Sequence, residues 1–270
     1  MSGSVPQFLE VAGGGGAPRR IACIADPPAS AGAASLFWLS GYKSDMASTK
    51  AGALAEFAHA RGYGCTRFDY SGHGLSGGRF EEGTIGTWLA EAEAVFRRIA
   101  KGPQIVVGSS MGGWIALLLL RRLMREAPAE AARIAALVLI APAWDMTEEL
   151  MWKQFPENAR RDLLKTGVYL QPSEYGEPYA ITRALIEEGR AHLFGRQPFD
   201  PGRPVAILQG ALDAAVPIAH TRELAGFLTG DRTELHEIAD GEHRLSRPQD
   251  LSLLFATIDR LAQGVAPPRA

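Results

Sequence analysis

Short apolar segments alternate with segments of helical periodicity along most of this chain, and this alternation is the strongest constraint on its fold. The apolar segments are three to six residues long and most are wholly apolar, which indicates strands buried on both faces. Such strands are typical of a parallel sheet with helices on both sides, so we expect an α/β fold with a mostly parallel central sheet. The expected strands are Gln7–Val11, Arg20–Ala25, Ser35–Leu39, Cys65–Tyr70, Ile105–Val107, Ala136–Ala141, Val205–Leu208 and Thr233–Ile238. The expected helices are Thr49–Ala60, Thr87–Ala100, Met111–Arg125 and Pro248–Ala262.

Two local patterns refine this picture. The first two strands flank the glycines at 13–16 and are expected to form a hairpin. The helix at 87–100 is amphipathic, with its apolar stripe facing the core. The stripe consists of Trp88, Ala92, Val95, Phe96 and Ile99, and the residues expected to face away are Glu91, Glu93, Arg97 and Arg98.

Composition excludes several classes of protein. The 270 residues carry 28 basic and 30 acidic side chains, a net charge of −2, which favours neither nucleic acid nor an anionic membrane as a partner. The 46% hydrophobic content excludes a disordered chain. The longest wholly apolar run, 114–120, is too short to span a bilayer, and no secretory signal precedes the first strand. The two cysteines, Cys23 and Cys65, are expected to be buried free thiols in a reducing compartment.

The stretch from Trp144 to Gln197 interrupts the alternation. It is rich in aromatic and methionine residues set among charges and shows no good strand before Val205. We therefore expect residues 1–143 and 198–270 to form the core and residues 144–197 to form a mostly helical lid insertion over the sheet edge. Trp144, Met151, Trp152 and Tyr169 are its candidate substrate-binding residues, and packing of the insertion onto the sheet is the equally weighted alternative.

The motif G-x-S-x-G occurs at residues 108–112, between an expected strand and an expected helix. This context is typical of a nucleophile elbow, in which a strained turn exposes a serine hydroxyl at the carboxyl edge of the sheet. The helix N-terminus adds a favourable field for a developing oxyanion. Ser110 is therefore the candidate nucleophile, and a plain glycine-rich turn is the alternative.

A serine hydroxyl needs a base to take its proton and a carboxylate to orient that base. Asp213 follows the strand at 205–208 and is the candidate acid, ahead of Asp200 and Asp231, which do not directly follow a strong apolar strand. His243 follows the last strand in a glycine-bearing loop and is the candidate base, with His73 as the second choice. The order Ser, Asp, His along the chain agrees with the motif.

An oxyanion hole requires two backbone N–H groups. Met111, directly after the nucleophile, supplies one candidate, and Tyr42, in the loop after the strand at 35–39, supplies the other. Ser40 stands where a histidine is usual, which leaves a main-chain donor intact. No cluster of His, Asp or Glu has metal-ligand spacing, so neither a metal nor a cofactor is expected.

Three sequence strings resemble the α/β-hydrolase superfamily, and within it the branch of palmitoyl-protein thioesterases and acyl-glucuronide esterases with its bacterial homologues. The strings are LSGYKSDM (39–46), RFDYSGHGLS (67–76) and GPQIVVGSSMGGW (102–114), and the likeness extends over residues 35–262, including TGVY (166–169) and PSEY (172–175). The resemblance implies an α/β-hydrolase fold, hydrolysis of cysteine thioesters such as palmitoyl groups, and a triad of Ser110, Asp213 and His243.

The resemblance also implies partners: an acylated small molecule or an S-acylated protein, with no nucleic acid and no integral membrane segment. The alternatives are a broad carboxylesterase for short acyl esters, an acylaminoacyl-type peptidase, and a non-catalytic ligand receptor of the same fold. The alanine content and the preference for arginine over lysine are typical of a bacterial protein from a GC-rich genome. Because no organelle-targeting segment precedes the first strand, a cytoplasmic location is expected.

Overall fold

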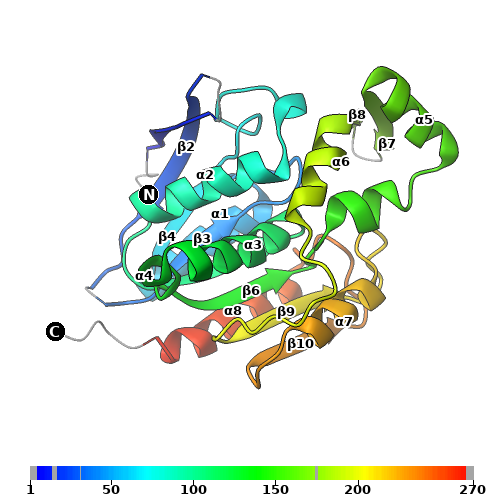
Figure 1. Cartoon of the computed structure of the whole chain (residues 1–270). Coiled ribbons are helices and arrows are strands. Elements are labelled where there is room, and N and C mark those ends of the chain that lie inside the picture. The colour runs from blue at the N-terminus through cyan, green and yellow to red at the C-terminus, as the bar shows by residue number, and fades with distance from the viewer. Residues whose placement is uncertain (1–4, 14–16, 31, 174–175, 266–270) are drawn as a thin grey trace.

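A mixed eight-stranded sheet forms the centre of the molecule (Figure 1). The computed structural model describes residues 5–13, 17–30, 32–173 and 176–265. The strand order is β1-β2-β4-β3-β5-β6-β9-β10, in which β1 and β2 run antiparallel to their neighbours and all other pairs are parallel. The strands are β1 (Gln7–Val11), β2 (Arg19–Asp26), β3 (Ser35–Leu39), β4 (Gly64–Phe68), β5 (Gln104–Ser109), β6 (Ile134–Ile140), β9 (Val205–Gly210) and β10 (Thr233–Ile238). The expected sheet and the β1–β2 pairing are confirmed, while Gly14–Gly16 of the expected turn lie outside the described residues.

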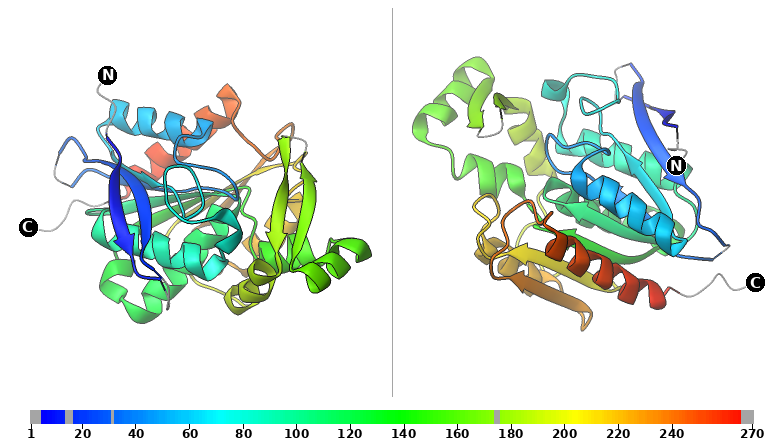
Figure 2. Two further views of the ribbon diagram at one scale, coloured as in Figure 1. Left: turned by 90° about the horizontal axis from the view of Figure 1, so that it is seen from above. Right: turned by 180° about the vertical axis from the view of Figure 1, so that it is seen from behind.

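Helices cover both faces of this sheet. On one face α1 (Thr49–Arg61) packs beside α8 (Pro248–Gln263), as the view from behind shows (Figure 2). On the other face lie α2 (Ile85–Arg98), α3 (Met111–Glu126) and α7 (Ile218–Phe227), with the short helices Phe80–Glu82 and α4 (Pro128–Ala131) at the ends of connections. Each face has its own apolar cluster because the strands are apolar on both sides.

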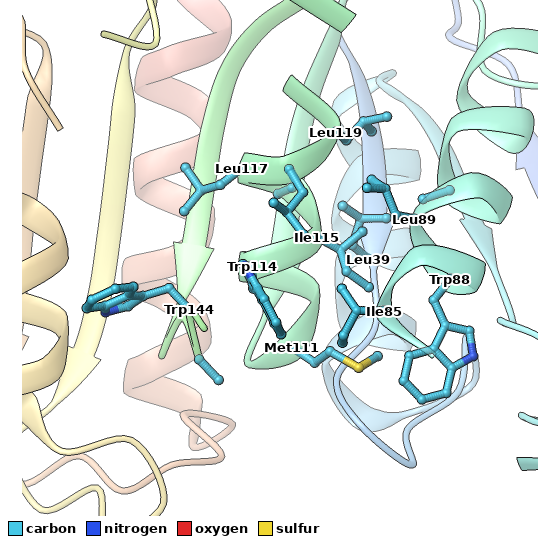
Figure 3. Close-up of a cluster of buried hydrophobic side chains, with 14 of the residues drawn as sticks. Leu39, Ile85, Trp88, Leu89, Met111, Trp114, Ile115, Leu117, Leu119 and Trp144 are labelled. Carbon is cyan, nitrogen blue, oxygen red and sulfur yellow. The ribbon is translucent and has the colours of Figure 1, made fainter. Parts of the chain in front are cut away.

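Helix α3 is deeply buried. All of its residues from Met111 to Leu120 are buried, because one side of the helix packs on β5 and another packs against α2. In Figure 3, Met111 and Ile115 of α3 lie beside Ile85 and Leu89 of α2. This packing fixes the start of α3, and therefore Ser110, relative to the sheet.

One expectation for α2 is wrong. Glu91 was expected to face away from the core, but its side chain is fully buried. It accepts a hydrogen bond of 2.8 Å from the Ser71 N–H and pairs with the Arg19 guanidinium at 2.5 Å. A carboxylate at this position is tolerated because both of its oxygens have partners, which offsets its desolvation. The helical pattern alone could not show this, because Ser71 and Arg19 are distant in sequence.

Residues 144–197 form a mixed rather than a mostly helical unit. They contain a π-helical segment (Thr147–Trp152), α5 (Glu157–Thr166), the hairpin of β7 (Val168–Ser173) and β8 (Gly176–Thr182), α6 (Arg183–Gly189) and a 3₁₀ turn (Arg190–His192). In Figure 1 this insertion follows β6 and lies to one side of the sheet, with α5 and the hairpin farthest out. The expected absence of strands here is therefore wrong, and Glu174 and Tyr175 lie outside the described residues.

Cys23 and Cys65 are buried and unpaired, as expected. Burial raises the pKa of both thiols to about 12, so neither ionises at neutral pH. Within the described residues, no helix combines the length and the apolar character that crossing a bilayer would require.

Candidate active site

Ser110 stands in the turn between β5 and α3 with an unusual backbone conformation. Its φ of 54° and ψ of −119° lie in a region that residues with a side chain rarely occupy. Glycines make the turn sterically possible: a Cβ at Gly108 would overlap the Gly112 backbone, and a Cβ at Gly112 would overlap the Leu39 carbonyl. Strand and helix can therefore approach closely, and the Ser110 side chain remains partly exposed at the carboxyl end of β5.

His243 and Asp213 complete a hydrogen-bonded chain with this serine. The Ser110 Oγ is 3.1 Å from His243 Nε2, and His243 Nδ1 is 2.8 Å from Asp213 Oδ2. A carboxylate oxygen can only accept, so Nδ1–H donates to Asp213, and the neutral ring leaves Nε2 free to accept the serine proton. The Asp213 side chain is fully buried, while the His243 side chain is 34% exposed.

Asp213 lies in the turn after β9 and accepts hydrogen bonds from four N–H donors. Oδ1 accepts from the backbone N–H groups of Ala215, at 2.9 Å, and Val216, at 2.8 Å. Oδ2 accepts from His243 and from the Gln209 amide, which is 3.2 Å away. Because both oxygens are occupied, the carboxylate has a single orientation, with Oδ2 facing the imidazole.

The loop that carries His243 is braced from both sides. Arg247 pairs with Asp240 before His243 and with Asp250 after it, each at 2.8 Å. From α1, the Lys50 ammonium donates to the Arg244 carbonyl. Burial lowers the pKa of Lys50 to about 8, an effect strengthened by Arg244 and opposed by the carboxylates Asp250 and Asp213.

The loop after β3 lies directly against the serine. A Cβ at Gly41 would come within 3.3 Å of the Ser110 Cβ, so the glycine permits this close approach. The Ser40 hydroxyl accepts a hydrogen bond of 2.9 Å from the Trp38 indole and is buried. Tyr42 follows Gly41 on this loop, and Met111 begins α3, where the first N–H groups have no partner within the helix.

His73, the second candidate for the base, is engaged elsewhere. Its Nδ1 lies 3.1 Å from the Ser71 carbonyl, and its Nε2 accepts from the Lys43 N–H at 3.3 Å. Burial lowers the pKa of His73, in keeping with a neutral ring that supports the loop after β3. The other candidate acids, Asp200 and Asp231, precede β9 and β10 and so lie at the opposite edge of the sheet from Asp213.

The four insertion residues expected to bind substrate have different surroundings. Trp144 has no exposed surface: its ring stacks on His220 at 4.5 Å, and its indole N–H donates to the His220 carbonyl. Figure 3 shows Trp144 on the opposite side of the buried cluster from Trp88. In this structure the Trp144 side chain anchors the start of the insertion to α7, and its expected role in substrate binding stays a prediction.

Met151, Trp152 and Tyr169 are half-buried. The guanidinium groups of Arg160 and Arg190 lie over the Trp152 ring, at 5.5 and 5.2 Å. Tyr169 packs edge-on against Phe155 with ring centroids 5.5 Å apart. These contacts lie within the insertion, and a small cavity of about 70 Å³ beside Trp152 is lined by residues of α5 and α6.

Comparisons with known proteins identify the family. The family model described as serine aminopeptidase, S33, matches residues 32–186, more than half of the chain. The chain belongs to this family of α/β hydrolases. It is a serine hydrolase of the α/β-hydrolase esterase family.

Relatives of this hydrolase agree with that placement. It is 33% identical to human mitochondrial palmitoyl-protein thioesterase ABHD10 over 228 residues, 84% of this chain and 72% of the relative. A putative hydrolase from Agrobacterium vitis S4 is similar in structure, with a TM-score of 0.91 and 41% identity over 96% of this chain and 98% of the other. The α/β hydrolase domain-containing protein 10 from mouse has a TM-score of 0.82 and 28% identity over 97% of this chain and all of the other.

Three residues of the hydrolase site escaped the sequence reasoning. They are Gln209 beside Asp213, Lys50 beside the His243 loop, and Tyr179, whose ring is 6.4 Å from the Tyr42 ring. None belongs to a motif. Lys50 and Tyr179 contact segments far away in the chain, and Gln209 lies only four residues before Asp213 but in no pattern that marks its role. Among the described residues, no group of three or more His, Cys, Asp or Glu is arranged to hold a metal ion.

Proposed function

We propose that this hydrolase cleaves acyl thioesters or esters through Ser110, His243 and Asp213, as a palmitoyl-protein-thioesterase-like enzyme. The hydrogen-bonded chain from the strained Ser110 through His243 to the buried Asp213 is the observation that carries the proposal. A nucleophile, a base in reach of it, and a buried carboxylate that orients the base are the requirements for acyl transfer through a serine.

The reaction has two steps. His243 Nε2 takes the Ser110 proton as Oγ attacks the carbonyl carbon, and Asp213 stabilises the imidazolium that forms. The N–H groups of Tyr42 and Met111 bind the oxyanion of the tetrahedral intermediate. His243 then protonates the leaving thiolate or alkoxide, and an acyl-enzyme remains on Ser110. Water, activated by His243, hydrolyses this acyl-enzyme and restores the serine.

The preference for a long acyl thioester rests on the relatives and on the insertion. The human relative is named a palmitoyl-protein thioesterase. In this proposal residues 1–143 and 198–270 form the hydrolase core, and residues 144–197 act as a lid whose Met151, Trp152 and Tyr169 line an acyl site. Each methylene buried there contributes about 0.8 kcal/mol, so an apolar lining favours a long chain.

A broad carboxylesterase for short acyl esters is the second candidate. Two sets of contacts within the insertion favour it. The Trp152 ring packs against Arg160 and Arg190, and the Tyr169 ring packs against Phe155. With those rings engaged, an acyl chain gains less apolar surface to contact. The two candidates share the same catalytic residues and differ in the substrate alone.

The deciding measurement is kcat/KM for matched oxygen esters and thioesters from acetyl to palmitoyl. We expect efficiency to rise with chain length and thioesters to exceed esters, because a longer chain buries more apolar surface in the lid. A maximum at short chains without a thioester preference would leave the catalytic residues in place and favour the carboxylesterase.

Variants of two adjacent serines test the chemistry itself. We expect Ser110→Ala to abolish burst acylation and to lower kcat by at least about 10⁴-fold, because no nucleophile remains. Ser109→Ala is the matched control, since Ser109 is the buried last residue of β5, and its kcat should stay near that of the wild type. Unchanged turnover in Ser110→Ala would refute the assignment of the nucleophile.

A further inference from the structure

Gln209 is a fully buried polar residue at the carboxyl end of β9, next to the candidate triad. Its Nε2 lies 3.2 Å from Asp213 Oδ2, 2.9 Å from the Val216 carbonyl and 3.1 Å from the Gly210 carbonyl. Its Oε1 accepts a hydrogen bond of 2.7 Å from the Thr221 hydroxyl on α7. Every polar atom of this side chain therefore has a partner, and four different residues supply them.

These partners allow only one orientation of the amide. In the opposite orientation Oε1 would face two carbonyl oxygens and a carboxylate oxygen, three acceptors with no proton among them. The Thr221 hydroxyl reinforces the observed orientation by donating to Oε1. The two amide N–H groups consequently face the Val216 and Gly210 carbonyls and Asp213 Oδ2, which is the same oxygen that His243 Nδ1–H binds.

We propose that Gln209 is a positioning residue for the triad, which keeps Asp213 Oδ2 directed at His243 Nδ1. This inference rests on the proposed function, because it assigns Gln209 a role in the same reaction. The two backbone N–H groups of the turn hold Oδ1 alone, and they leave the carboxylate free to tilt about that oxygen. Gln209 removes this freedom by binding Oδ2 from the side of the sheet.

Thr221 extends this support to a second element. It is fully buried near the start of α7, and its hydroxyl is the link between that helix and the amide on β9. Asp213 is thus positioned by its own turn, by β9 and, through Gln209, by α7. Buried networks of this kind hold a side chain rigidly when every member has its partners.

The first test compares two buried glutamines at opposite edges of the sheet, one at the start of β5 and one near the end of β9. Gln209→Met keeps the side-chain length but removes the donor, and we expect kcat to fall about 10- to 100-fold with KM within twofold. The NMR resonance of the proton between His243 Nδ1 and Asp213 should shift as well. Gln104→Met is the matched control: Gln104 is buried at the start of β5, where its amide binds the Lys101 carbonyl, far from Ser110.

For Gln104→Met we expect kcat within twofold of wild type and an unchanged resonance. The inference is overturned if folded Gln209→Met keeps wild-type kcat, if its kcat falls without any change in the resonance, or if Gln104→Met loses kcat equally. The proposed function would instead be refuted if the wild-type protein has no hydrolase activity and a fluorophosphonate does not label it. The resonance would then still report whether Gln209 orients Asp213.

A second pair of variants covers the case in which Gln209→Met does not fold. Thr221→Val removes the hydroxyl that fixes the amide, and we expect kcat to fall about 3- to 10-fold with the resonance shifted in the same sense. Thr221→Ser keeps the hydroxyl and should restore both values to those of the wild type. Wild-type kcat in Thr221→Val would overturn the inference.

Discussion

The Ser110 backbone adopts a conformation that costs of order 1–3 kcal/mol in an ordinary loop. Three main-chain hydrogen bonds hold it there. The Ser110 N–H donates to the Ile140 carbonyl at 2.8 Å, and the Ser110 carbonyl accepts from Gly113 at 2.9 Å and from Ala143 at 3.1 Å. The ends of β5, β6 and α3 therefore meet at this one residue, and the strain directs its hydroxyl towards His243.

At Asp213, a substitution of a single atom should disable the triad. In Asp213→Asn, the amide oxygen can keep the place of Oδ1 and accept from the Ala215 and Val216 N–H groups. The new NH₂ group then replaces Oδ2 and faces the N–H donors of His243 and Gln209. The imidazole can then bind the NH₂ group only through an unprotonated Nδ1, which leaves Nε2 protonated and unable to accept from Ser110. We expect kcat to fall about 10⁴-fold at neutral pH, measured by steady-state kinetics on a fully folded variant. A loss of less than tenfold would indicate a different acid.

At the scale of single elements, the β7–β8 hairpin is the part of the insertion that reaches the loop after β3. The Lys43 ammonium lies 4.6 Å from the centre of the Tyr179 ring, and the Tyr42 hydroxyl donates to the Ala180 carbonyl at 3.5 Å. Burial raises the pKa of Tyr42, so this hydroxyl stays protonated. A two-stranded hairpin is only marginally stable alone, so these contacts help to hold it.

Removing the Tyr179 ring should loosen this hairpin without unfolding the core. We expect Tyr179→Ala to speed hydrogen exchange across residues 168–182, because the ring contacts with Tyr42 and Lys43 are lost. The free energy of unfolding, measured by thermal denaturation, should change by less than about 1.5 kcal/mol, because the buried clusters of the core remain. Tyr169→Ala is the control, because Tyr169 contacts Phe155 within the insertion. Unchanged exchange in Tyr179→Ala would show that other contacts hold the hairpin.

At the scale of the whole molecule, α7 connects the insertion to the sheet. His220 Nε2 is 2.9 Å from the Trp144 carbonyl, while the Trp144 indole donates to the His220 carbonyl. The next residue, Thr221, binds Gln209 and so supports Asp213. Successive residues of one helix thus anchor the start of the insertion and the acid of the triad.

This connection should make stability depend on pH. Burial lowers the pKa of His220 below its usual value of 6.5, an effect only partly opposed by its bond to the Trp144 carbonyl. Above pH 6.5 neither the folded nor the unfolded state binds the proton. As the pH falls, the unfolded state gains the proton first, and stability is lost down to the lowered pKa of the folded state.

His220→Gln separates this effect from packing. Glutamine can still donate to the Trp144 carbonyl but does not titrate, and it loses the stacked ring contact at 4.5 Å. We expect the variant to be about 1 kcal/mol less stable than wild type at pH 8, by denaturant unfolding, and the difference to shrink at pH 5.5. A constant difference across that range would show that the pKa of His220 is the same in the folded and the unfolded protein.

Much of this fold follows from local sequence patterns. The apolar runs predict the strands of the main sheet within one or two residues, and the glycines of G-x-S-x-G, in their strand–turn–helix context, predict the strained turn at Ser110. These features are local because a strand or a turn depends on a few consecutive residues. The loops after β9 and β10 also follow from the sequence, because the carboxyl ends of parallel strands share one edge. Asp213 and His243 were therefore predictable candidates.

What the tertiary structure decided is the partner of each polar or aromatic side chain. Glu91 is buried because Arg19 and Ser71 come to it, and Trp144 is buried because α7 covers it. The β7–β8 hairpin was missed because Pro172 and Pro178 interrupt its strands. Gln209 lies four residues before Asp213, and its amide orientation is set when Thr221 of α7 binds its oxygen. For Glu91 and Trp144 the environment of the side chain is made by segments distant in sequence, so the chain's local pattern carries no record of it.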